Sequence, residues 1–97
     1  MKWELQPQET NSTYHFSGRF LVTSGVQAEL TDEEIRTIYF LVQKLVKEND
    51  GLDYLLVFKN KEGLKLFFID QLNQEMLASS DHPPEHHYCT LLLASEY

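Results

Sequence analysis

The stretch between Thr31 and Gly51 constrains the fold most, because it carries every local mark of one long helix. Thr31 and Glu34 have the spacing of a capping box, in which each side chain pairs with the backbone amide of the other residue. Gly51 suits the left-handed position that follows many helices. Apolar side chains recur between these ends at helical spacing, at Ile35, Ile38, Tyr39, Val42, Leu45 and Val46. The pattern predicts a helix with a single apolar face.

Strand patterns fill most of the remaining chain. Apolar and polar residues alternate over residues 14–23, which is typical of a half-buried strand. A continuous apolar run at 53–58 predicts a strand that is covered on both faces. The turn sequence Asn60-Lys61-Glu62-Gly63 follows, and residues 64–69 predict the return strand of a hairpin. Residues 87–94 predict a last strand.

Two segments leave alternatives open. Residues 1–12 are compatible with a loose N-terminal arm or with an edge strand, and residues 71–78 with a short helix or a loop. The 97 residues predict one α+β domain, an antiparallel sheet of about four strands with the long helix on one face. Because one helix cannot cover both faces, the other face is expected to keep apolar surface suited to a partner.

The formal net charge of −7 disfavours direct nucleic-acid binding and anionic membranes, since both require clustered cations. No apolar run approaches the roughly 20 residues of a membrane helix, and the N-terminus lacks a hydrophobic signal core. Cys89 is the only cysteine, so an internal disulfide is excluded and a reducing, cytoplasmic setting is expected.

Several collinear blocks resemble a family of small uncharacterised bacterial proteins that are often encoded on plasmids and other mobile elements. They are Val22-Thr23-Ser24-Gly25-Val26, Glu48-Asn49-Asp50, Ile69-Asp70, Asp81 with Pro83 and Pro84, and the ending Thr90-Leu91-Leu92-Leu93-Ala94-Ser95-Glu96-Tyr97. The last block is the most specific, because it is similar to the family's Thr-x-x-Leu-Ala-x-Glu-Tyr ending. The family has no established activity, so the resemblance implies a fold and a mobile-element setting.

A cluster of metal-binding residue types lies between His82 and Cys89. His82, His86, His87 and Cys89 belong to the zinc ligand set, but their spacing fits no standard zinc motif. Adjacent histidines on a strand point to opposite faces. A solvated loop that enters a strand is the simpler interpretation, so we expect no metal and no cofactor.

Catalytic groups are not evident in the sequence. Cys89 lies within an apolar strand, where cysteines are usually inert. Asp53 and Asp70 could pair across the hairpin, although polar ends of buried strands explain them much better. The chain has no Gly-rich phosphate loop and no nucleophile elbow. These observations predict a protein without enzymatic activity.

Acidic residues gather at the start of the long helix. Glu29, Asp32 and Glu33 stand beside Glu34, where carboxylates oppose the positive end of the helix dipole. They are also candidates for contact with a basic partner.

Three functions stay open at this point. The first is a regulatory module that binds a protein or itself, through an exposed sheet face or the edge of the Leu91-Leu92-Leu93 strand. The second is an acidic inhibitor, encoded on a mobile element, that acts on host defence or nuclease machinery. The third is a metal-binding protein that uses the segment from His82 to Cys89.

Overall fold

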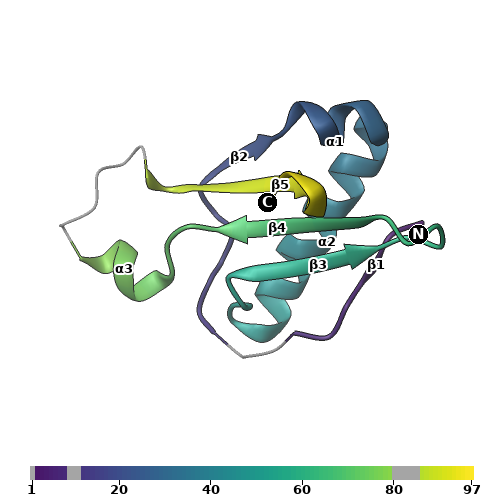
Figure 1. Cartoon of the computed structure of the whole chain (residues 1–97). Coiled ribbons are helices and arrows are strands. Elements are labelled where there is room, and N and C mark those ends of the chain that lie inside the picture. The colour runs from purple at the N-terminus through teal and green to yellow at the C-terminus, as the bar shows by residue number, and fades with distance from the viewer. Residues whose placement is uncertain (1, 9–11, 80–85) are drawn as a thin grey trace.

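The computed structural model describes residues 2–8, 12–79 and 86–97, and it shows an α+β fold with a five-stranded sheet and one long helix (Figure 1). The elements in chain order are β1 (Glu4–Leu5), β2 (Arg19–Val22), α1 (Ser24–Glu29), α2 (Asp32–Asn49), β3 (Leu55–Lys59), β4 (Lys65–Asp70), α3 (Gln74–Ala78), β5 (Tyr88–Leu93) and the 3₁₀ turn η2 (Ala94–Glu96). In this part of the chain, no helix is both long and apolar enough to cross a bilayer.

The sheet is mixed, so the prediction of about four antiparallel strands was wrong in count and in direction. The strand order is β1-β3-β4-β5-β2, and β2 runs parallel to β5 while every other neighbour pair is antiparallel. The 18-residue helix α2 is the physical reason, because it carries the chain back behind the sheet to the end at which β2 began. The next strand must then run in the direction of β2, and β5 regains that direction after the hairpin.

Helix α2 follows the local signals of the sequence. The Thr31 hydroxyl accepts the Glu34 amide at 3.1 Å, and the Glu34 carboxylate accepts the Thr31 amide at 3.0 Å. The predicted capping box is therefore confirmed. At the other end, Asp50 takes the left-handed conformation with φ 54°, and Gly51 follows it with φ 121°. The prediction that placed Gly51 in the left-handed position was wrong by one residue.

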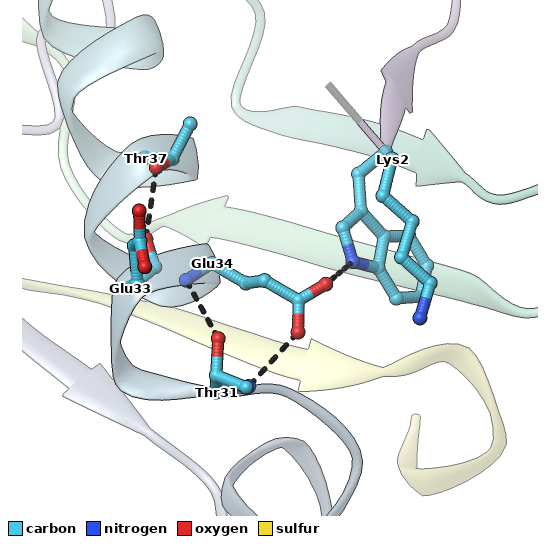
Figure 2. Close-up of a pocket in the computed structure, with 6 residues that line it drawn as sticks. Lys2, Thr31, Glu33, Glu34 and Thr37 are labelled. Atoms are coloured by element: carbon cyan, nitrogen blue, oxygen red, sulfur yellow. Dashed lines mark hydrogen bonds between the residues drawn. The ribbon is translucent and has the colours of Figure 1, made fainter.

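The described part of the N-terminal segment is anchored, which makes the edge-strand alternative right for residues 4–5. Leu5 pairs with Phe58 of β3. Trp3 is only 3% exposed, and its indole Nε1 donates to a Glu34 carboxylate oxygen at 3.2 Å. Glu34 therefore caps α2 and also fixes the N-terminal segment (Figure 2).

The first predicted strand is shorter than the alternation suggested, because Phe16 has φ 51° and interrupts the extended backbone. The Phe16 amide donates to the buried Asp70 carboxylate at 2.9 Å, and the Phe16 carbonyl accepts the Gln43 side-chain amide at 2.7 Å. These contacts hold a left-handed conformation that a bulky residue rarely adopts. Past β2, the Thr23 side chain caps α1, a helix that the sequence pattern did not predict.

The hydrophobic core lies between α2 and one face of the sheet (Figure 1). Helix α2 contributes four buried aliphatic residues, Ile35, Ile38, Val42 and Val46. The strands contribute alternate residues, which share one face because side-chain direction alternates along a strand. They are Leu56, Phe58, Leu66, Phe68, Cys89 and Leu91. We call this side of the sheet the covered face.

Candidate interaction surface

The opposite side of the sheet carries two apolar rows, and we call it the open face. Register places Val57, Phe67 and Leu92 side by side in one row. The neighbouring row consists of Leu55, Ile69, Thr90 and Leu21. All seven side chains are half-buried, and none belongs to the core cluster or packs against it. In Figure 1, α2 lies behind the sheet while this face is turned toward the viewer. The expected apolar surface on the second face is therefore present.

The hairpin strands are covered on one face by α2, so the prediction that the 53–58 strand is covered on both faces was wrong. The central residues of both strands are apolar on both sides because the open face is apolar as well. The proposed contact through the edge of the Leu91-Leu92-Leu93 strand is also wrong, because β5 is an interior strand between β4 and β2. Beyond the end of β2, the Leu93 amide donates to Glu96.

The C-terminal turn η2 extends the open face at one corner. The Tyr97 ring meets the Phe67 ring edge-on at a centroid distance of 5.4 Å, while Tyr97 stays 75% exposed. A Glu96 carboxylate oxygen accepts the Leu93 amide at 2.9 Å and the Thr23 hydroxyl at 2.7 Å. These two hydrogen bonds lower the pKa of Glu96, with the Leu93 amide as the larger cause. The turn is thus tied to the start of α1.

Gly25 shows how closely these two segments approach. A side chain at Gly25 would lie 2.7 Å from the Glu96 carboxylate, which is too short for an unstrained contact. The blocks 22–26 and 90–97, singled out separately in the sequence, therefore meet in space. This contact fixes Tyr97 beside the apolar rows.

Basic side chains border the open face at both ends of its strands. Lys59 and Lys65 form a register pair at the turn end, and both are exposed. Arg19 is exposed at the other end, opposite Tyr88 in the register. Glu4 faces Lys59 from β1. The ends of the strands on this face are thus predominantly basic, in a chain whose net charge is −7.

The acidic candidates lie on a different part of the surface. Glu29 ends α1, and Asp32 and Glu33 lie in the first turn of α2; all three are exposed. Glu33 lines a pocket of about 230 Å³ together with Lys2, Trp3, Thr31, Glu34 and Thr37 (Figure 2). Hydrogen bonds from Thr31 and Trp3 lower the pKa of Glu34, with the Thr31 backbone amide as the largest cause.

The exposed side of α2 does not continue this acidic cluster. Arg36, Lys44 and Lys47 are exposed along it, and acids return only at Glu48. The charge therefore changes sign along the helix. An extended acidic surface, as mimicry of a nucleic acid requires, receives no support from α2.

The candidate metal ligands between His82 and Cys89 lie only partly within the described residues. His82 lies outside them. His86 is exposed, and the Nε2 atom of the half-buried His87 lies 3.3 Å from the Ser17 hydroxyl. Cys89 is fully buried on the covered face, where burial and then the Asp70 charge raise its pKa to about 12. Among residues 2–8, 12–79 and 86–97, no group of three or more His, Cys, Asp or Glu side chains is arranged to hold a metal ion.

Asp70 is the buried charge of the covered face, 3% exposed and opposite Cys89 in the register. One carboxylate oxygen accepts the Phe16 amide, and the other makes no hydrogen bond of good geometry to a described residue. Burial raises the pKa of Asp70, and the amides of Phe16, Leu72 and Gln71 together with His87 oppose that rise. The carboxylate holds the left-handed Phe16 in place, which is a structural role.

Asp53 is also buried, 6% exposed, but a different hydrogen bond holds it. Its carboxylate accepts the Tyr54 amide at 2.7 Å. Burial is the main cause that raises the pKa of Tyr14, and the charges of Asp70 and Asp53 raise it further. The two carboxylates therefore share an environment around Tyr14, while each has its own backbone partner.

Comparison with known proteins adds no assignment. No family model matches the chain, and no curated protein or solved structure matches it significantly.

Proposed function

We propose that this protein is a non-enzymatic module that binds a protein partner through the open face. The observation that carries the proposal is the contrast between two faces of one sheet. Both faces present rows of large apolar side chains, but α2 covers only one of them. Contiguous apolar surface on a soluble domain usually marks a site of interaction.

The chemistry of the polar groups supports a binding role over catalysis. The Cys89 thiol is buried and its pKa is about 12, so it is protonated and unreactive at neutral pH. Asp70 holds the Phe16 backbone, Asp53 the Tyr54 amide, and Glu34 the start of α2. These carboxylates are engaged in holding the fold.

Site-specific photo-crosslinking in the cells that naturally carry the protein tests the proposal. A photoreactive aromatic amino acid replaces Leu92 at the centre of the open face, or Phe40 as the control. Phe40 is 64% exposed on α2, so it is the more accessible of the two positions. We expect a discrete protein adduct from position 92 and none from position 40. No adduct from position 92, or the same adducts from both, would overturn the proposal.

A further inference from the structure

We infer that the partner on the open face is an amphipathic helix of another protein whose apolar stripe is flanked by acidic residues. This inference rests on the proposed binding through the open face and adds the chemistry of the partner. Two observations carry it, the sign of the charges at the strand ends and the dimensions of the apolar rows.

The charges come first. Lys59 and Lys65 stand at one end of the open face and Arg19 at the other. Strand register places one acid on this face, Glu4, and the η2 turn adds the exposed Glu96 at one corner. The chain as a whole has fifteen acidic and eight basic residues. Basic side chains therefore outnumber acidic ones on the open face, whereas the reverse holds for the whole chain. Complementary charges around an apolar centre favour an acidic partner and set its orientation.

The dimensions fit one helix. The longer apolar row crosses β3, β4, β5 and β2, which lie about 4.8 Å apart, so it is roughly 15–20 Å long, the length of a helix of about 10–13 residues. Along the strands, about 20 Å separates the basic ends of the open face, the span of a six-residue strand such as β4. A helix that lies across the strands is about 10–12 Å wide with its side chains, so both of its flanks face these basic ends. Such a helix would cover Phe67 and Leu92, as α2 covers the other face, and complete a three-layer arrangement.

A second copy of the chain fits this surface less well. When two copies meet face to face with aligned strands, the strands run either in the same or in opposite directions. In the first case Lys59 and Lys65 face the same lysines of the other copy, and in the second they face its Arg19. Both arrangements place cations against cations around the contact, which costs affinity.

Two designed peptides of about 18 residues test the inference by fluorescence anisotropy at low and at physiological salt. Both carry the same leucine stripe at helical spacing, flanked by glutamates in one peptide and by lysines in the other. We expect the wild-type protein to bind the glutamate peptide about tenfold more tightly, as two or three exposed ion pairs would give. Added salt should reduce the preference.

Charge-reversed variants locate the effect. The double variant Lys59→Glu/Lys65→Glu should reverse the preference between the peptides. The control variant Lys44→Glu/Lys47→Glu makes the same change in net charge on exposed positions of α2, so it should keep the wild-type preference. Equal binding of both peptides, or the same response from both variants, would overturn the inference.

The remaining outcomes separate the inference from the proposed function. An adduct at position 92 with a second copy, or with a protein segment that has no acidic helix, would overturn the inference and leave binding through the open face intact. The inference would also be overturned, with binding through the open face intact, if the wild-type protein sediments as a dimer and the Leu92→Arg variant sediments as a monomer. If position 92 gives no adduct, both ideas fail.

Discussion

Phe67 and Phe68 are neighbours on β4, yet they belong to different environments. The Phe68 ring is fully buried on the covered face, with ring centroids 4.7 Å from Phe16 and 5.5 Å from Phe20. Phe67 lies on the open face, where its ring meets the exposed Tyr97 ring edge-on. Residue type and strand are the same, so the helix on one side makes the difference. Hydrophobicity along a strand shows what can be buried, while the layers around the sheet decide what is buried.

The largest expected effect separates these two phenylalanines. Phe68→Ala should lower the free energy of unfolding by about 3–5 kcal/mol, because it removes a ring from a packed core. Phe67→Ala should cost about 1 kcal/mol or less, because the ring is only half-buried. Urea denaturation followed by circular dichroism measures both. Similar losses would mean that the open face is covered in solution, and the comparison of the two faces would break.

Asp70 offers a second test of the difference between the two faces, because it is an acidic side chain buried on the covered face. Its folded-state pKa is raised above the ordinary 3.8, so the native state holds the proton more tightly than the unfolded chain. Its contribution to stability is therefore fully present below pH 3.8 and is lost as the pH rises through the folded-state pKa. The Asp70→Asn variant removes this titration. The melting temperature of the wild type relative to Asp70→Asn should therefore decrease as the pH rises through the acidic range.

Glu34 and Glu96 provide an internal reference for that experiment. Their lowered pKa values contribute stability that is lost as the pH falls below their ordinary range, in both proteins alike. The difference between the two profiles therefore isolates Asp70. Parallel profiles would show that the pKa of the Asp70 carboxyl is not raised by burial.

The smallest expected effect concerns the helix that covers one face. Thr31→Ala removes the hydroxyl that accepts the Glu34 amide, so it should cost about 1 kcal/mol, or roughly 4–8 °C in melting temperature. Glu33→Lys is the matched control, since Glu33 is exposed and its side chain takes no part in the capping box. Its effect should stay within about 0.5 kcal/mol. A large loss from Glu33→Lys would contradict the role assigned to this turn.

The predictable part of the fold was the part encoded locally. Helix α2 has its cap, its apolar period and its end within 21 consecutive residues, from Thr31 to Gly51, and the structure has it there. The hairpin of β3 and β4 was likewise predictable from two apolar runs and one turn. The left-handed Phe16 was not, because it depends on Asp70, 54 residues further along the chain. A local alternation cannot report a constraint of that kind.

The existence of an open face was predictable, because the sequence shows one long helix and one helix covers one face of a sheet. The residues that lie on that face were not predictable. Which of two adjacent positions faces α2 depends on strand register, and the apolar runs show no alternation to reveal it. The hydrogen bond from the Thr23 hydroxyl to Glu96 was not predictable either, since the two residues are 73 positions apart in the sequence. By contrast, Cys89 was correctly expected to be buried, because it stands inside an apolar run.

The parallel pairing of β2 with β5 has a consequence for the order in which the molecule is made. In the described sheet, β2 has β5 as its one neighbour, and β5 begins 66 residues after the end of β2 at Val22. During synthesis, β2 can pair only after most of the chain has been made. Pairing across so many residues is slow, and an apolar strand that is not yet paired is prone to aggregate. Helix α2 is complete by Asn49, so it can form early and cover the apolar side chains of the covered face before the last strand has paired.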